Sequence, residues 1–341
     1  MGGNVSFDGV SADRIDLKEV DRADFVRSLS LGLGLINSAF QKKTGFPIWK
    51  YGIQEYLSGS TTTLFDLTIP TEKYKGIKPS VGDIDTQVDG NSEKQLQEFL
   101  KGAKGEKYGD LELVDSKTTP NTIVTLWRHT RYGLNIQIDL ELVSFLNGKP
   151  TPWSRFIFSS PWADMELGIK GAAHKLIFRA ITAIWNRNIR IQMKTEQKEV
   201  ETSHLAFSSK GLRTKLEPIE GNLYREIPTT DSTYVTSLPD IFKTLFGTTA
   251  SKSDLEKMHS YIGVIDLCKR YLKKSDLTTV AYGMANLLFG SGSGGRLMYV
   301  HDHERDRAEK LVMLHYMCEK FGINPNVFDK LVEGYYKRMG K

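Results

Sequence analysis

The sequence predicts an α+β protein, in which an N-terminal mixed sheet with flanking helices is followed by a mainly helical C-terminal domain. Between residues 82 and 143, several segments alternate apolar and polar side chains, which is typical of half-buried strands. Beyond residue 150, apolar residues recur mostly at helical spacing. The chain has 341 residues, of which 40% are hydrophobic and 26% charged. This is enough for two domains with substantial cores.

The N-terminal elements follow from these patterns. Residues 1–20 are polar and mixed in charge, and we expect them to be loosely ordered. Residues 21–40 place Phe25, Leu29, Leu33 and further apolar side chains at helical spacing, and Asp21 or Asp24 can cap this helix. We then expect a short strand over 53–57, a strand over 82–89, a helix over 91–101, and strands over 111–114, 122–129 and 134–143.

A domain boundary is predicted near residue 150, where Gly148–Pro152 is rich in glycine and proline. This gives a first domain over 21–150 and a second over 151–341. In the second domain we expect one long helix from Pro161 to Trp185. We expect strands over 188–193 and 205–216, and helices over 240–246, 253–272, 278–288, 303–321 and 326–338.

Charge and cysteine content restrict the class of protein. Residues 1–150 carry a net charge of −2 and residues 151–341 a net charge of +7, which fits a polyanion partner for the second half. Only two cysteines are present, which excludes a disulfide scaffold and favours a reducing compartment such as the cytoplasm. No apolar run is long enough to span a bilayer. Residues 1–6 match the N-myristoylation pattern, which is short enough to occur often by chance.

Acidic residues gather on one face of two predicted strands. Positions i and i+2 of a strand point to the same side, so Asp83 and Asp85 project together, as do Asp139 and Glu141. In neighbouring strands, Asp83, Asp85 and Asp139 would come close together. Three adjacent carboxylates repel one another unless a divalent cation neutralises them, and oxygen ligands favour Mg²⁺ or Mn²⁺. The alternative is that these acids are solvated positions on an open sheet face.

A Gly-Ser pair precedes the acids. At Gly59-Ser60 no side chain of the glycine blocks a phosphate from the backbone N–H groups. Together, Gly59-Ser60, Asp83-Ile84-Asp85 and Asp139 resemble the signature of the DNA polymerase β-type nucleotidyltransferase superfamily. The resemblance covers about residues 21–145 and implies a nucleotidyltransferase-like catalytic domain over 21–150.

The resemblance implies a role for each acid. Asp83 and Asp85 would hold two Mg²⁺ (or Mn²⁺) ions that bridge the phosphates of a nucleoside triphosphate. Asp139 would bind the catalytic metal and help to activate an acceptor hydroxyl for attack on the α-phosphate, and pyrophosphate would leave. Glu141 shares the face of Asp139 and competes for this third position. We favour Asp139, which lies nearer the middle of its strand.

The resemblance also implies which residues bind the nucleotide. Gly59 and Ser60 would hold the β- and γ-phosphates. Helical Lys or Arg residues beyond the catalytic core often reach the triphosphate in this superfamily, so Lys170 and Lys175 are candidates. Either could instead be a solvated cation on an amphipathic helix. The spacer between Ser60 and Asp83 is 22 residues long, which is longer than usual in this superfamily. An insertion of this kind in a surface loop costs little free energy.

The sequence therefore predicts a metal-dependent nucleotidyltransferase that moves a nucleoside monophosphate to an acceptor hydroxyl. RNA, such as tRNA, fits the basic second half, and a protein or small-molecule hydroxyl fits the chemistry equally well. The alternative is a non-catalytic nucleic-acid-binding or structural protein that retains the fold. A lesser alternative is a glycosyltransferase that binds a nucleotide sugar through Asp83 and Asp85, which leaves Gly59, Ser60 and Asp139 without roles.

Overall fold

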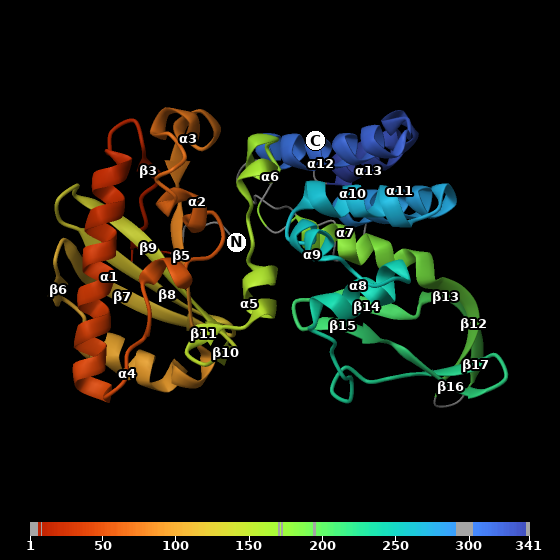
Figure 1. Ribbon diagram of the computed structural model, residues 1–341, viewed down its shortest axis with the longest axis horizontal. Coiled ribbons are helices and arrows are strands. Elements are labelled where there is room, and N and C mark those ends of the chain that lie inside the picture. Colours follow the sequence, from red (N-terminus) through yellow and green to blue (C-terminus); the bar gives the residue numbers. More distant parts are fainter. Residues whose placement is uncertain are drawn as a thin grey trace. The chain divides into compact units, whose positions relative to one another are not determined.

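A computed structural model of the chain describes residues 6–7, 9–169, 171, 173–193, 196–290 and 303–338. The chain divides into two compact units, Met1–Trp162 and Ala163–Lys341. The boundary predicted from the sequence lies at residue 150, whereas the structure keeps residues 151–162 with the first unit. The predicted α+β class is confirmed, because a mixed five-stranded sheet is followed by a largely helical region (Figure 1).

The first unit is built on a five-stranded sheet with the order β5-β9-β8-β7-β6. Its strands are β5 (Asp83–Asp89), β6 (Lys107–Tyr108), β7 (Leu111–Thr119), β8 (Thr122–His129) and β9 (Leu134–Val143). Strands β6 to β9 form an antiparallel meander, whereas β5 pairs with β9 in parallel. The parallel pair therefore joins two segments that are distant along the chain.

Helices α1 (Arg22–Thr44) and α4 (Glu93–Gly102) cover the sheet. Figure 1 shows α1, in red, crossing the strands. Asp21 caps α1 by accepting a hydrogen bond from the backbone N–H of Asp24, and Gly45 ends the helix with a φ of 88°. The two helices and the strands share one buried core. Its helical members include Phe25, Leu29, Leu33, Ile36 and Phe40 of α1 and Leu96, Phe99 and Leu100 of α4.

Shorter elements complete the first unit. They are β1 (Ser6–Phe7), β2 (Val10–Ser11), β3 (Ile15–Asp16), η1 (Ile53–Glu55), η2 (Gly90–Ser92), β10 (Phe145–Leu146), β11 (Lys149–Pro150) and α5 (Pro152–Ile157). The short strand expected over residues 53–57 is wrong. Residues 53–55 form a single 3₁₀ turn, and only Leu57 makes a β-bridge, to Thr86 of β5.

The segment between Ser60 and Asp83 is folded rather than an open loop. It contains α2 (Thr61–Phe65), α3 (Thr71–Ile77) and β4 (Ser80–Val81), which pairs with β3. The guanidinium of Arg22, at the start of α1, is fully buried against this segment. It donates hydrogen bonds of 2.7–3.0 Å to the backbone carbonyls of Thr63, Leu64, Asp66 and Ile69. A buried guanidinium needs such partners, and these bonds tie the segment to α1.

The long helix expected from Pro161 to Trp185 is wrong. The structure has α6 (Trp162–Glu166), then α7 (His174–Ile181), which continues into a 3₁₀ turn, η3 (Thr182–Trp185). Gly168 has a φ of 71°, a left-handed conformation that ends a right-handed helix. The predicted helix over 253–272 also divides, into α9 (Lys252–Lys257) and α10 (Tyr261–Tyr271).

The second unit combines the remaining helices with strands. The helices are α8 (Leu238–Phe246), α11 (Lys274–Phe289), α12 (His303–Phe321) and α13 (Asp329–Arg338), the last preceded by η5 (Pro325–Phe328). The strands are β12 (Asn186–Gln192), β13 (Gln197–Ser203), β14 (Leu205–Ser208), β15 (Gly211–Thr214), β16 (Leu216–Glu220) and β17 (Leu223–Glu226). They form a sheet of order β13-β12-β17-β16 and a β14-β15 hairpin.

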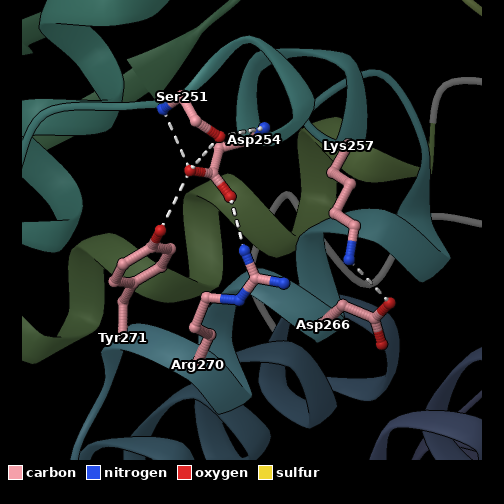
Figure 2. Close-up of polar contacts among 6 residues, drawn as sticks. All are labelled: Ser251, Asp254, Lys257, Asp266, Arg270 and Tyr271. Atoms are coloured by element: carbon pink, nitrogen blue, oxygen red, sulfur yellow. Dashed lines mark hydrogen bonds and ion pairs between the residues drawn. The ribbon is translucent and has the colours of Figure 1, made fainter.

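One buried carboxylate joins helices of the second unit (Figure 2). Asp254 of α9 is 1% exposed and accepts hydrogen bonds from Ser251, from the hydroxyl of Tyr271 and from the guanidinium of Arg270. Ser251 in turn accepts from the backbone N–H of Asp254, which completes a capping box at the start of α9. Asp254 therefore fixes α9 against the end of α10.

Among the described residues, no helix combines the length and the apolar character needed to cross a bilayer.

Candidate active site

The parallel pairing of β5 with β9 brings the predicted acids together. In the register of this pair, Asp83 lies opposite Gln137 and Asp85 lies opposite Asp139. Since alternate residues of a strand share a face, Asp83, Asp85 and Asp139 project to one side. One carboxylate oxygen from each of the three lies within 4.8 Å of the others. These three side chains thus form a single acid group.

The electrostatics of the group oppose full ionisation. Burial, followed by the charges of Asp83, Glu141 and Asp139, holds the pKa of Asp85 well above its usual range. Burial also raises the pKa of Asp139 to about 6, helped by the charge of Asp83 and opposed by a 2.9 Å hydrogen bond from the Gln137 side chain. Repulsion of this kind is relieved by a cation, and a set of carboxylate oxygens is the donor set that Mg²⁺ and Mn²⁺ prefer. The residues present therefore fit a divalent metal ion.

The Gly59-Ser60 turn lies directly against the acid group. Gly59 has a φ of 54°, and a Cβ atom added to it would stand 2.6 Å from Oδ2 of Asp85. The backbone N–H of Ser58 donates to the carbonyl of Asp85, and the backbone N–H of Asp85 donates to the hydroxyl of Thr61. Hydrogen bonds on both sides of the turn thus hold it to β5.

The turn does not offer both of its backbone N–H groups to a ligand. The N–H of Gly59 donates a 2.9 Å hydrogen bond to the carbonyl of Phe158. Gly59 therefore contributes space beside Asp85, because it has no Cβ. Ser60, the next residue, is half-buried.

Asp139, rather than Glu141, belongs to the acid group. Both carboxylates are 9% exposed. Glu141 lies opposite Gln87 in the β5–β9 register. Its Oε2 atom accepts a 2.6 Å hydrogen bond from the hydroxyl of Ser58. Glu141 thus supports the chain that enters the turn, while Asp139 faces Asp85.

The structure describes one of the two lysines predicted to bind nucleotide. Lys170 lies outside the described residues. Lys175 is half-buried on α7, in the second unit. The predicted site residues that the first unit brings together are Gly59, Ser60, Asp83, Asp85 and Asp139.

A cation that no sequence motif marks lies beside the turn. The ammonium group of Lys78 donates a hydrogen bond to the hydroxyl of Ser60. Lys78 follows α3, in the segment that was expected to be a loop. No motif marks it, because its approach to Ser60 depends on how residues 61–77 fold. Gln137 was not predicted as a site residue either. It lies two residues before Asp139 on the same face of β9, and its side chain donates to the Asp139 carboxylate.

No protein-family model matches the chain, and no curated protein sequence is significantly similar to it.

Proposed function

We propose that the protein is a metal-dependent nucleotidyltransferase, which transfers a nucleoside monophosphate from a nucleoside triphosphate to an acceptor hydroxyl. The observation that carries the proposal is the convergence of Asp83, Asp85 and Asp139 with the Gly59-Ser60 turn packed against them. These are the residues that the resemblance to the DNA polymerase β-type superfamily selects. Their meeting in one place is expected of a nucleotide site.

Each group has a role in this reaction. Asp83, Asp85 and Asp139 would hold Mg²⁺ or Mn²⁺. A divalent cation bound there would neutralise charge on the phosphates and lower the pKa of the acceptor hydroxyl. The carboxylate of Asp139 would orient the acceptor hydroxyl and accept its proton. The acceptor oxygen then bonds to the α-phosphorus as the bond to pyrophosphate breaks.

RNA, including tRNA, is the acceptor we favour. The net charge of +7 over residues 151–341 supports a polyanionic partner. A hydroxyl of a protein or a small molecule would serve the same chemistry. We place the reaction in the cytoplasm because Cys268 and Cys318 are both free thiols.

A glycosyltransferase is less well supported. Asp83 and Asp85 alone would suit the metal site of such an enzyme. That reaction gives no role to Asp139, or to the close approach of Gly59 to Asp85.

A transfer assay tests the proposal. The protein is incubated with each α-labelled nucleoside triphosphate, Mg²⁺ or Mn²⁺, and an extract that contains RNA and protein. We expect label on one class of acceptor, loss of label in Asp85→Asn, and retention in Asp89→Asn. Asp89 is the matched control, because it lies on the same strand and face but outside the acid group.

The outcomes separate the alternatives. Absence of label together with a Mg²⁺-dependent rise in melting temperature on adding nucleotide supports a small-molecule acceptor, since a ligand stabilises the state that binds it. Absence of both label and thermal shift contradicts the proposal and favours a non-catalytic protein that retains the fold.

A further inference from the structure

A cation and a hydroxyl lie beside the glycine that packs against the acid group. The ammonium of Lys78 donates to the hydroxyl of Ser60. Ser60 follows Gly59, whose backbone lies against the carboxylate of Asp85. A hydroxyl oxygen that accepts a hydrogen bond from an ammonium keeps its own hydrogen for another acceptor. Lys78 and Ser60 together therefore offer a positive charge and an O–H donor at the edge of the acid group.

The position of Lys78 is fixed by packing. Its backbone N–H donates a 2.7 Å hydrogen bond to the carbonyl of Tyr74, which ends α3. The ring of Tyr74 is fully buried and stacks on Trp162, with 5.8 Å between ring centroids and 16° between planes. The guanidinium of Arg22 lies 4.3 Å from the centroid of the same ring. Held between a cation and an aromatic ring, Tyr74 places α3, and with it Lys78, relative to the turn.

Arg22 fixes the other end of the same segment. Through its bonds to four backbone carbonyls between Thr63 and Ile69, it holds the chain between α2 and α3. One buried side chain thus contacts both the chain after Ser60 and the aromatic residue that precedes Lys78. The segment of residues 61–78 is a fixed support for its lysine.

We propose that Lys78 is a nucleotide-binding residue, whose ammonium group binds the terminal phosphates of the nucleoside triphosphate together with the hydroxyl of Ser60. The inference rests on the proposed function and deepens it. Carboxylates alone repel a triphosphate, so a site built on Asp83, Asp85 and Asp139 needs positive charge on the side where the phosphates lie. Ammonium groups bind phosphate oxygens through charge-assisted hydrogen bonds.

This role also accounts for the length of the spacer. The 22 residues between Ser60 and Asp83 leave the turn, fold into α2 and α3, and return a lysine to the residue at which they began. A shorter spacer could not form both helices and bring a lysine back to Ser60. The segment of residues 61–82 therefore supplies the cation that binds the terminal phosphates in this proposal.

Binding measurements on the full chain test the role of Lys78. The probes are Mg²⁺ with each nucleoside triphosphate, inorganic tripolyphosphate, and the corresponding nucleoside monophosphate, all by calorimetry. In Lys78→Met we expect affinity for the triphosphate and for tripolyphosphate to fall about 10- to 100-fold, because a charge-assisted contact is lost. Affinity for the monophosphate should change less than about threefold, since it lacks the terminal phosphates.

Two further variants serve as controls. Lys78→Arg keeps the charge and should retain most of the triphosphate affinity. Lys75→Met removes a cation from α3, the helix that precedes Lys78. Lys75 forms a 3.4 Å ion pair with exposed Glu72, and the variant should bind like the wild type. Melting curves without ligand show whether each variant is folded, and Lys78→Gln replaces Lys78→Met if the latter is not.

Each result has a distinct meaning. Wild-type triphosphate affinity in Lys78→Met overturns the inference and leaves the proposed function intact. An equal loss for the monophosphate and the triphosphate also overturns it, because the effect would not then concern the terminal phosphates. Absence of Mg²⁺-dependent nucleotide binding in the wild type overturns the proposed function itself, and the role of Lys78 with it.

Discussion

A Cβ atom on Gly59 would stand 2.6 Å from Oδ2 of Asp85, closer than side-chain carbons approach other atoms. A side chain at this position would therefore have to displace the carboxylate of Asp85. The same residue has a φ of 54°, which L-amino acids with a side chain seldom adopt. Space and backbone conformation independently require glycine at this point.

Replacement of Gly59 by alanine should damage both the fold and the site. We expect Gly59→Ala to destabilise the first unit by about 1–3 kcal/mol and to displace Asp85, which weakens Mn²⁺ binding. Urea unfolding and electron paramagnetic resonance of Mn²⁺ measure the two effects. The control is Gly76→Ala within α3, where a Cβ meets nothing within 4 Å. It should stabilise the protein by about 0.5–1 kcal/mol. Equal effects of the two changes would contradict the steric argument.

The stability of the metal-free protein should depend on Asp139 and on pH. Its folded-state pKa of about 6 lies above the unfolded value of about 3.9. Between these values the native state holds a proton that the unfolded chain has released, so the free energy of unfolding falls as the pH rises from about 4 to 6. Asp139→Asn cannot ionise, and its amide oxygen can still accept from Gln137. In EDTA at pH 7.5 we expect the variant to be more stable than the wild type by on the order of 2 kcal/mol.

Urea unfolding over a pH series checks this expectation. The difference between Asp139→Asn and the wild type should shrink as the pH falls towards 4 and vanish below about pH 3, where the carboxyl of Asp139 is protonated in both folded and unfolded states. Equal stability of the wild type and Asp139→Asn at pH 7.5 without metal would contradict the raised pKa of Asp139.

Asp139 and Glu141 should differ in their effect on metal binding. Asp139→Asn removes a member of the acid group and should weaken Mn²⁺ binding by at least about tenfold. Glu141→Gln keeps an oxygen that can accept from Ser58 and removes a charge that raises the pKa of Asp85. Its Mn²⁺ affinity near neutral pH should stay within about threefold of the wild type. A larger loss in Glu141→Gln than in Asp139→Asn would make Glu141 the third ligand.

Asp254 should be a main source of stability in the second unit (Figure 2). Asp254→Ala leaves the partners of a buried carboxylate without an acceptor, and we expect a loss of about 2–4 kcal/mol. Lys257→Met removes a 3.4 Å ion pair with half-exposed Asp266, and should cost less than about 0.5 kcal/mol. Urea unfolding followed by circular dichroism compares the two variants. A loss of similar size in both would contradict the distinction between a buried carboxylate and an exposed ion pair.

The same carboxylate should make the second unit sensitive to acid. Hydrogen bonds from the hydroxyl and then the backbone of Ser251 hold the pKa of Asp254 below its usual range. A carboxyl whose folded pKa is lowered stabilises the protein above its unfolded pKa, and this contribution is lost as the pH falls through the folded value. The difference between the wild type and Asp254→Ala should therefore shrink below about pH 4.

Strands of the first unit were predictable from the local alternation of apolar and polar residues, which is most regular in β9. The predictions for 122–129 and 134–143 are confirmed at both ends, and Asp83–Asp89 falls within the strand predicted over 82–89. Alternation of apolar and polar residues marks such strands whatever their neighbours are. The pairing partner carries no comparable local signal, so the parallel register that sets Asp85 opposite Asp139 had to come from the structure.

The elements that were predicted wrongly depend on a single backbone conformation or on contacts between distant residues. The helix from Pro161 to Trp185 was predicted because its apolar spacing is helical, yet Gly168 adopts a left-handed conformation there. The segment of residues 61–82 was expected to be a loop because it is polar and contains proline and glycine. Its helices are stabilised by the buried guanidinium of Arg22, which lies in a different part of the sequence. The position of Lys78 beside Ser60 depends on how this segment folds, and so no local pattern indicates it.

The parallel union of β5 with β9 has a consequence for how the first unit folds. Hairpins such as β7–β8 and β8–β9 close from adjacent residues, whereas β5 and β9 are separated by α4, β6, β7 and β8, so we expect the β5–β9 pair to form last. Asp85 and Asp139 oppose each other across that last-formed pair, so their mutual repulsion at neutral pH acts as a barrier to its closure. We therefore expect divalent cations to accelerate refolding of the first unit, and we expect Asp139→Asn to refold rapidly without them.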